Sequence, residues 1–419
     1  MDRLSTSASH TSVLATVLIQ QNRVQNAETQ VASGKRAPDY TGLGRDAGRL
    51  LDLETVRTRL ESLARNNDTV QRRLDLTDTS LTSIDETLRD FRTSLLTVGG
   101  NDPLDQQHVA DLQAAAFRAL QNLQASLNTE ADGRYLFSGS RVTSQPVDLG
   151  LTTLADFQAR FDGDQVLYPT TRDAHLSDGG ALGHADTGDL TVVGATITAA
   201  NASAFASVDV GVTITIAGST NGNDGTYTVI DKPANNQLVV SKALTNATEA
   251  AATISLPASW YHGDEVAATH QVEVQRSLSL DLTAINPVFE KAIRAAGLIA
   301  QGAFGTNGGL DAHPERVSDA LYLLNSAIDQ TVNGTPPFGP EEPTNIDDVR
   351  RQIGYQQVLL DETRTRQEDF AANLEISASK IEDMDIHEAV AQLLEESQSL
   401  EAAYKAVARI RQLSLVDML

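Results

Sequence analysis

The first residues in this sequence that could carry chemistry are His387 and Glu388. A helix that opens with His-Glu can bind zinc and use the glutamate as a general base, but it needs a second histidine four residues after the first. Ala391 stands at that position. We therefore expect His387 and Glu388 to be ordinary polar residues of a helix.

A second candidate is the glycine-rich stretch at Gly42, Gly44 and Gly48. It resembles a dinucleotide-binding loop, in which glycines let the backbone approach a pyrophosphate. The glycine spacing is wrong, however, and the polar segment 35–40, not a strand, precedes it. We interpret this stretch as a turn before a helix.

Titratable residues also gather at 262–265 and in two acidic runs, at 341–342 and 382–385. The first group follows Trp260 and Tyr261 and has no visible nucleophile or base paired with it, so we predict an exposed polar turn beside a partly buried aromatic pair. The acidic runs lack the six or more oxygens at loop spacing that calcium requires. We predict no catalytic residue, no cofactor and no metal.

Composition narrows the class of protein further. The 419 residues carry a formal net charge of −24, which repels nucleic acid and anionic lipid surfaces, and aromatic residues make up only 5%. Without cysteine the chain has no disulfide and no thiolate zinc site. The first residues lack the pattern of a secretory signal and no apolar run approaches the roughly 20 residues of a membrane span, so we expect no membrane insertion and no cleavable signal peptide.

The elements that position these residues are dominated by a long helix. Apolar residues recur at alternating spacings of three and four, the pattern of a coiled-coil seam. The seam comprises Leu53, Val56, Leu60, Leu63, Asn67, Val70, Leu74, Thr77, Leu81, Ile84, Leu88, Phe91, Leu95 and Val98. Segment 99–103 should end this helix, and an antiparallel helix over about 105–128 should follow. A polar residue at the seam position of Asn67 restricts register, although a tolerated surface residue would explain it equally well.

The same spacing returns near the other end of the chain and predicts the partner helix. Its seam comprises Ile346, Val349, Ile353, Gln356, Leu360, Thr363, Gln367, Phe370, Leu374, Ser377, Ile381 and Met384. Both chain ends add amphipathic helices, near 5–32 and 386–414, whose apolar stripes comprise Val13, Val17, Val24 and Val31 and then Leu393, Leu400, Val407 and Ile410. The two ends of the sequence should therefore meet in space.

Between these arms the composition shifts toward Gly, Thr, Val and Asp. Alternating runs at 212–216, 226–230 and 237–240, separated by turn residues, predict strands of a small antiparallel unit at about 189–256. Helices should resume near 287–300 and 314–330. The fold class is therefore α+β: a long helical bundle of both chain ends with a central β-rich outer domain, itself carrying the inserted β unit.

The expected domains follow from these boundaries. They are an N-terminal assembly helix and link (1–45), the two parts of the helical domain (46–139 and 341–385), the outer domain (140–340) and a C-terminal assembly helix (386–419).

Both ends of the chain resemble the bacterial flagellin family. Segments 5–7 and 32–36 are similar to its N-terminal region, and segments 381–389, 400–406 and 412–419 are similar to its C-terminal region. Residues 40–47 depart from the family's pattern. Within the family, segments 133–140, 260–264 and 286–290 are similar to stretches of the subunits that join the flagellar hook to its filament.

The resemblance implies a non-enzymatic structural subunit of the extracellular flagellum, exported by the flagellar type III apparatus. Its implied partners are copies of itself, the hook-side junction protein, filament flagellin and an export chaperone. A flagellin of the filament itself is the alternative. An enzyme displayed on the outer domain would need a catalytic constellation, and a secreted coiled-coil translocator would need a long apolar segment.

Overall fold

The computed structural model describes residues 2–98, 104–177, 189–250, 252–330 and 334–416; at 2–10, 98 and 410–416 it describes the backbone alone. The expected helix stop at 99–103 and the turn at 186–188 lie outside the described residues. The chain forms two compact units. One combines residues 1–67 and 361–419, and the other spans residues 68–360.

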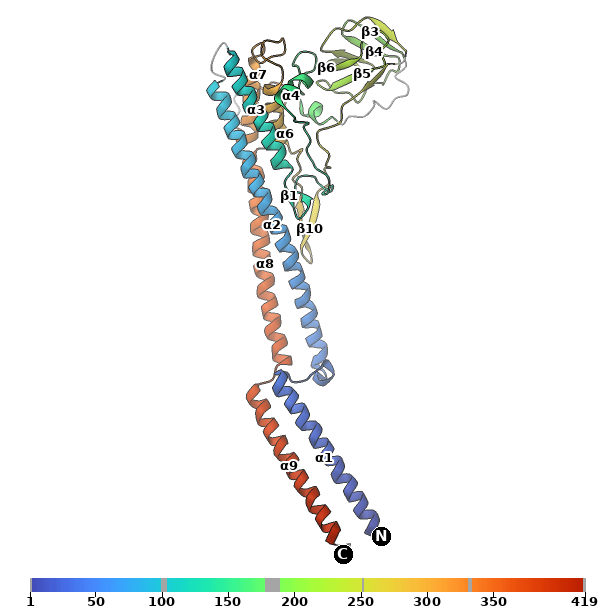
Figure 1. The fold of residues 1–419 in the computed structure, drawn as a ribbon, viewed down its shortest axis with the longest axis vertical. Coiled ribbons are helices and arrows are strands. Elements are labelled where there is room, and N and C mark those ends of the chain that lie inside the picture. Colours follow the sequence, from blue (N-terminus) through green and yellow to red (C-terminus); the bar gives the residue numbers. More distant parts are fainter. Residues whose placement is uncertain (1, 99–103, 178–188, 251, 331–333, 417–419) are drawn as a thin grey trace. The chain divides into compact units, whose positions relative to one another are not determined.

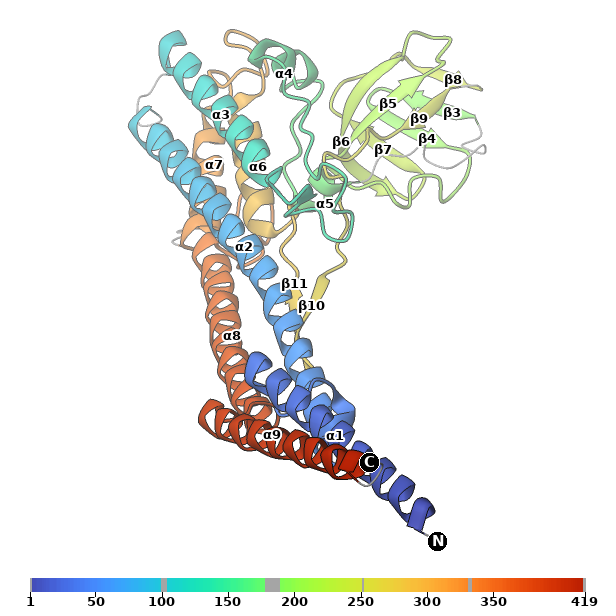
Figure 2. The same ribbon diagram turned by 60° about the horizontal axis from the view of Figure 1, so that its bottom comes forward.

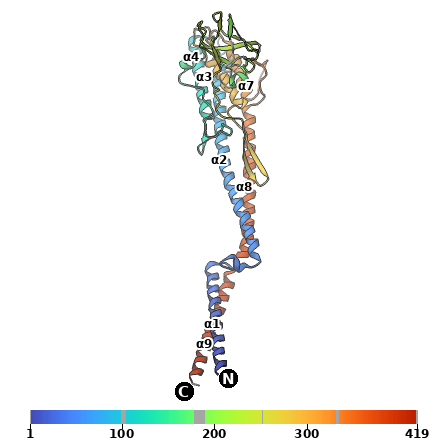
Figure 3. The ribbon, with the colours of Figure 1, turned by 90° about the vertical axis from the view of Figure 1, so that its right-hand side faces the viewer.

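The first unit is entirely helical apart from its links. It contains α1 (Asp2–Ser33), η1 (Tyr40–Leu43), the start of α2 (Asp46–Val98), the end of α8 (Ile346–Glu382) and α9 (Ile386–Val416). Helices α1 and α9 lie side by side with their outer ends together (Figure 1, Figure 3). The two ends of the sequence therefore meet, as the matching apolar stripes predict.

Local sequence explains how the helices of this unit begin. The Asp39 carboxylate accepts hydrogen bonds from the backbone N–H groups of Thr41 and Gly42, at 3.0 and 3.2 Å, and so caps the short η1 turn before α2. Asp385 accepts from His387 N at 2.9 Å and caps α9 in the same way. Gly42 and Gly44 thus lie in the predicted turn, whereas Gly48 already lies in α2. One residue of the acidic run 382–385 is a helix cap.

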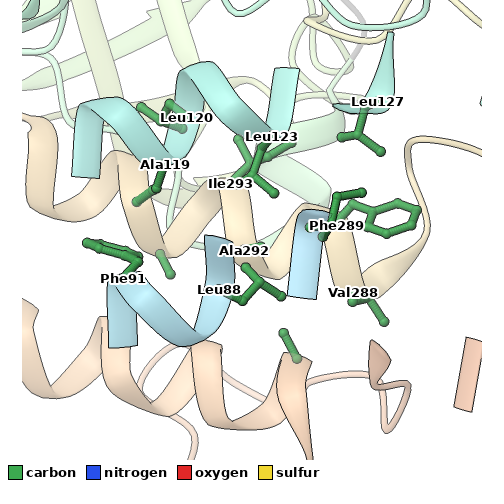
Figure 4. Packing of buried hydrophobic residues seen from close by; sticks show 14 of the residues in the cluster. Leu88, Phe91, Ala119, Leu120, Leu123, Leu127, Val288, Phe289, Ala292 and Ile293 are labelled. Carbon is green, nitrogen blue, oxygen red and sulfur yellow. The ribbon is translucent and has the colours of Figure 1, made fainter. Parts of the chain in front are cut away.

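The second unit is built around five helical segments. The remaining part of α2 lies beside α3 (Gln106–Leu127), α6 (Pro287–Ala300), α7 (Glu315–Ile328) and the start of α8. In Figure 4, Phe91 of α2 lies next to Ala119 of α3 and Leu88 lies next to Ala292 of α6, all within one apolar cluster. The six predicted core positions of α3 are all fully buried: Val109, Leu112, Ala116, Leu120, Leu123 and Leu127.

Helix α6 is the centre of this core. Asn286 caps it by accepting from Val288 N at 3.1 Å, and Pro287 fixes its first turn. All residues of α6 from Val288 to Ala300 are buried, including Glu290, Lys291 and Arg294. Since a helix surrounded on all sides has no solvent face, its charged residues must find partners inside the protein.

Strands are fewer in the outer segment than its composition suggests. Apart from the β1–β2 bridge (Glu130–Ala131, Arg134–Tyr135) the described strands are the hairpin β10 (Ala268–Glu273) with β11 (Arg276–Leu280) and those of the insert at 189–256. The rest of this segment contains the short helices α4 (Leu154–Arg160) and α5 (Arg172–Leu176), together with α6 and α7. The helices α6 and α7 share one core with α2 and α3, although they lie within the segment expected to form the outer domain.

The insert is a seven-stranded antiparallel sheet with its own core (Figure 2). Its strands are β3 (Leu190–Val193), β4 (Thr196–Ala199), β5 (Thr213–Ala217), β6 (Gly225–Ala234), β7 (Gln237–Val240), β8 (Ala247–Glu249) and β9 (Thr253–Ser255), in the order β8-β3-β4-β7-β6-β5-β9. Inward side chains alternate along β3 and β4, and Phe205 and Val208 from the β4–β5 connection complete the core. The three predicted strands, at 212–216, 226–230 and 237–240, correspond to β5, β6 and β7, and β6 is longer than predicted.

The insert rests on the preceding segment through polar contacts centred on Gln165. The Gln165 amide donates to Thr226 O at 2.9 Å, its backbone carbonyl accepts from Thr228 N and from Ser241 Oγ, and Leu167 N donates to Thr228 Oγ1 at 2.8 Å. The two cores remain separate clusters, so the insert depends little on its neighbours for apolar burial.

Candidate assembly surface

The terminal helices α1 and α9 contact each other along the predicted stripes. Val17 and Ala27 of α1 and Ala389 of α9 are buried. The remaining predicted positions with described side chains are half-buried: Val13, Val24, Val31, Leu393, Leu400 and Val407. Ile410 lies in α9, but its side chain lies outside the described residues. The stripes thus mark the least exposed face of each helix.

Each terminal helix also exposes a second apolar face. On α1 this face comprises Leu14, Leu18 and Ile19, which are 47, 60 and 55% exposed. On α9 it comprises Ile386, Val390 and Leu394 at successive spacings of four, which are 51, 40 and 58% exposed. Residues four apart lie on one side of a helix, so these side chains form a continuous surface. Contiguous exposed apolar surface marks a site of protein association.

Polar contacts fix the register of the two terminal helices. The Gln20 amide contacts both the backbone carbonyl and the carboxylate of Glu396. Near the inner end, Arg36 N donates to Glu382 O at 2.7 Å and Met384 N donates to Gly34 O at 2.9 Å. The links at both inner ends are therefore paired with each other through their backbones.

The seam between α2 and α8 is buried from Asn67 onward. Its buried members on α2 are Asn67, Val70, Leu74, Thr77, Leu81, Ile84, Leu88, Phe91 and Leu95, and those on α8 are Ile346, Val349, Ile353, Gln356, Leu360, Thr363, Gln367 and Leu374. Nearer the start of α2, Leu53, Leu60 and Leu63 are half-buried and Val56 is 41% exposed. In the second unit, Arg350 of α8 links to α2 through Thr82 Oγ1 at 3.2 Å and Asp78 at 3.6 Å.

Phe370 does not follow the predicted seam in this chain. Its side chain is 51% exposed, while Ala371 beside it is half-buried and Ala378, not Ser377, is buried. The inward positions after Thr363 therefore run 367, 371, 374 and 378, with two successive spacings of four. An α-helix has 3.6 residues per turn, so a strict seven-residue repeat drifts, and one extra four-residue step moves the seam to the neighbouring row.

The structure decides between the two interpretations of Asn67. Its side chain is 1% exposed, and its amide donates to Gln367 Oε1 at 3.1 Å. Thr363, fully buried, lies one turn before Gln367. Asn67 is therefore part of a buried polar layer and not a surface residue, which favours a role in register.

A buried ionic cluster on α6 escaped the sequence analysis. Arg294 pairs with Glu290 at 2.9 Å and with Glu341 at 2.7 Å, and His175 Nδ1 lies 2.9 Å from Glu290 Oε1. The His175 Nε2 atom lies 3.0 Å from the Tyr168 hydroxyl. Burial lowers the pKa of His175, so a neutral ring donates to Glu290 and accepts from Tyr168.

This chain of groups, a hydroxyl, an imidazole and a carboxylate, is buried in the core. Both ring nitrogens of His175 are hydrogen-bonded, to Tyr168 and to Glu290, and burial raises the pKa of Tyr168 far above its usual range. Next to it, Lys291 donates to Ser326 Oγ at 2.9 Å and to the carbonyls of Glu342 and Thr344 at 2.8 Å. The cluster ties segments 168–175 and 341–344 to α6.

The other chemical candidates are structural. His387 is exposed, and no cluster of metal-binding side chains occurs among the described residues. Asp264 accepts hydrogen bonds from Ser140 N and Oγ, at 2.7 and 2.5 Å, which lowers the pKa of its carboxyl. Segment 262–265 is thus the predicted polar turn, and Trp260 and Tyr261 beside it are buried and half-buried.

Comparison with known families accounts for the two arms. Residues 4–142 match the bacterial flagellin N-terminal helical region, and residues 341–419 match the bacterial flagellin C-terminal helical region. Together these matches span more than half of the sequence. The chain belongs to the bacterial flagellin family. It is therefore a structural protein of the flagellum, and the helices α1, α2, α3, α8 and α9 lie in the regions that match the family.

Solved structures resemble this flagellin-family chain only distantly. One is assigned as a flagellar hook-associated protein of Vibrio parahaemolyticus, with 11% identity, a TM-score of 0.39 and coverage of 80% of this chain and 97% of that one. Another is flagellar hook-associated protein 3 of Legionella pneumophila, with 16% identity, a TM-score of 0.37 and coverage of 78% of this chain and 98% of that one. A third is FlgL of Xanthomonas campestris, with 14% identity, a TM-score of 0.36 and coverage of 77% of this chain and 98% of that one. No curated protein sequence matches the chain.

Family membership agrees with the remaining physical features. Flagellin-family proteins are parts of the extracellular flagellum. Across the described residues, none of the helices combines the length and apolarity needed to span a bilayer.

Proposed function

We propose that this chain joins the flagellar hook to the filament, the place of hook-associated protein 3. The observation that supports the proposal is the meeting of the three segments, 133–140, 260–264 and 286–290, whose sequences are similar to junction subunits. The first segment lies 120 residues before the second, and the second lies 22 residues before the third. They nevertheless form one contact region where the helical core passes to the insert-bearing segment.

The contacts in this region are specific. Asp264 N donates to Ser138 O at 3.1 Å, while its carboxylate accepts from Ser140. The rings of Phe137 and Phe289 meet edge to face with centroids 5.8 Å apart. Gly139 has a φ of +68°, and an added Cβ there would lie 2.1 Å from Asp264 O, so only glycine fits this turn.

The second apolar faces of α1 and α9 supply the means of assembly. In a single chain these faces are exposed to water. Burying apolar surface contributes about 25 cal/mol of favourable free energy per Å². Copies of this chain, the hook-side junction protein and filament flagellin are the proposed partners that cover them. We further propose export by the flagellar type III route with a chaperone, without a cleavable signal peptide and without any enzymatic activity.

Position in the flagellum tests the junction assignment. The chain has no cysteine, so Ala234→Cys at the exposed end of β6 provides a unique dye site. One labelled spot at the end of each hook is the expected result. Continuous labelling along the filament would show a filament flagellin instead, and the unsubstituted chain controls for nonspecific dye.

Charge on the exposed face of α9 tests the assembly surface. Val390→Glu with Leu394→Glu should leave the monomer folded, because both side chains are already in water, but should block incorporation and swimming. The matched control is Gln392→Glu with Ser399→Glu, which adds the same charge to exposed positions on another side of the helix. Deleting 386–419 should likewise give a soluble, non-incorporating protein. Normal swimming of either variant would contradict the proposed role of this helix.

A further inference from the structure

We propose that a pocket beside the insert binds a pyranose ring of a saccharide. The pocket has a volume of about 170 Å³ and opens where the chain runs into and out of the insert. Segment 168–177 lines one side, segment 257–260 another, and Val212 and Thr213 of the insert a third. A cavity of about 150 Å³ holds benzene, so a single six-membered ring fits.

Aromatic rings form the wall of this pocket. Tyr168, His175 and Trp260 follow one another with centroids 5.4 and 5.2 Å apart, and Phe161 lies 4.9 Å from Tyr168. Aromatic residues are only 5% of the sequence, and Trp260 is its single tryptophan. Tyr168, His175 and Trp260 are 4, 5 and 9% exposed, so the small part of each ring that lines the pocket supplies apolar surface for the C–H groups of a sugar ring.

Hydrogen bonds hold these rings in place before any ligand binds. Trp260 Nε1 donates to His175 O at 2.9 Å, and the Tyr168 hydroxyl contacts His175 Nε2. Tyr168 also packs against Gly297 so closely that a Cβ there would lie 2.2 Å from its ring. A binding surface fixed in this way loses little conformational entropy when a ligand arrives.

Polar groups at the rim match the hydroxyls of a sugar. The Arg160 guanidinium stacks over Phe161 with its central carbon 4.7 Å from the ring centroid, donates to Leu149 O at 2.7 Å, and feels the charge of the Asp148 carboxylate. Asp148 accepts from Gly150 N through one oxygen, and its other oxygen has no hydrogen-bond partner in the described parts of the chain. A donor and an acceptor beside an aromatic wall therefore face the pocket.

This combination favours a saccharide over an aromatic side chain of another protein. An aromatic side chain would fill the apolar wall but would leave both Arg160 and Asp148 without new partners, whereas ring hydroxyls donate to the carboxylate and accept from the guanidinium. The pocket admits one ring, so we expect weak, millimolar affinity for a monosaccharide.

The single tryptophan gives a direct assay on the full-length monomer. Methyl glycosides of glucose, galactose, mannose and N-acetylglucosamine are titrated while Trp260 fluorescence is followed. We expect a saturable change with at least one of them. Asp148→Asn and Arg160→Gln should each weaken its affinity roughly tenfold. Asp164→Asn, an exposed carboxylate outside the pocket, should leave it unchanged.

Three results would overturn the proposal. The first is the absence of any saturable fluorescence change up to about 50 mM pyranoside, far above a millimolar dissociation constant. The second is a response to N-acetyltyrosinamide alone, which would indicate an aromatic side chain as the ligand. The third is a pyranoside response that both rim substitutions leave intact. Saturation-transfer NMR on the same variants checks binding without relying on fluorescence, and circular dichroism verifies that each variant is folded.

Discussion

The change Leu81→Ala tests the central seam with a matched control on the same helix. Leu81 is fully buried in the core of the second unit, whereas Leu96, also on α2, is 62% exposed. Removing a buried leucine side chain costs its transfer free energy plus the cavity left behind, about 2–5 kcal/mol in all. Leu96→Ala should change the free energy of unfolding by no more than about 0.5 kcal/mol, because water already surrounds that side chain.

Guanidinium denaturation measures both variants. Trp260 belongs to the same apolar cluster as Leu81, so its fluorescence reports the unfolding of this core, and circular dichroism at 222 nm reports the helices. The unfolding midpoint of Leu81→Ala should fall with an unchanged slope, because the same surface is exposed on unfolding. The melting temperature should fall by roughly 6 °C or more for a loss of about 3 kcal/mol. Equal midpoints for the two variants would refute the assigned register.

Three other results are expected. Asn67→Leu should destabilise the first unit by about 1–3 kcal/mol because it leaves the buried Gln367 side-chain carbonyl without this donor. The double variant Asn67→Leu with Gln367→Leu should regain part of the lost stability in thermal melts. A double variant no more stable than Asn67→Leu alone would contradict the pairing. Replacing residues 189–256 by a short Gly/Ser bridge should preserve export and swimming, because the insert has its own core. A protein that is secreted but not incorporated into the flagellum would show instead that the insert contacts other subunits. Hydrogen bonds from Ser219 and from Thr220 N lower the pKa of Glu249 to about 2. The protection of backbone amides in the insert against hydrogen exchange should therefore be full above the ordinary value of 4.5 and be lost as pH falls toward 2. Glu249→Gln should lack this dependence, and identical pH profiles for the two proteins would refute the assignment.

The parts of the fold that depend on local spacing could be predicted from the sequence. The three-four repeats place α2 and α8, the apolar row from Val109 to Leu127 places α3, and the turn residues at 221–225 and 233–236 place three strands of the insert. Each of these signals lies within a few residues, so no knowledge of distant contacts is required. Phe370 marks the limit, because a shift of the seam by one row leaves the apolar pattern nearly unchanged.

The ionic cluster and the aromatic pocket could not be predicted in the same way. Glu290 and Arg294 are four residues apart, a spacing that indicates an ion pair but equally suits the solvent face of a helix. Only the position of α6 at the centre of the core makes them buried. Tyr168 and Trp260 are separated by the whole insert, so the wall that they form has no signature in the sequence.

The separation of the paired arms along the chain has a consequence for the order of folding. Asn67 and Gln367 are 300 residues apart, and closing an unstructured loop of that length costs about 5 kcal/mol of chain entropy. Most contacts of the insert and of the helical core lie within 68–360, so this middle can form first and bring residues 67 and 361 near each other. We therefore expect the arms to close last. A subunit whose arms close last presents its terminal helices, still uncommitted, at the moment when it meets a neighbouring subunit.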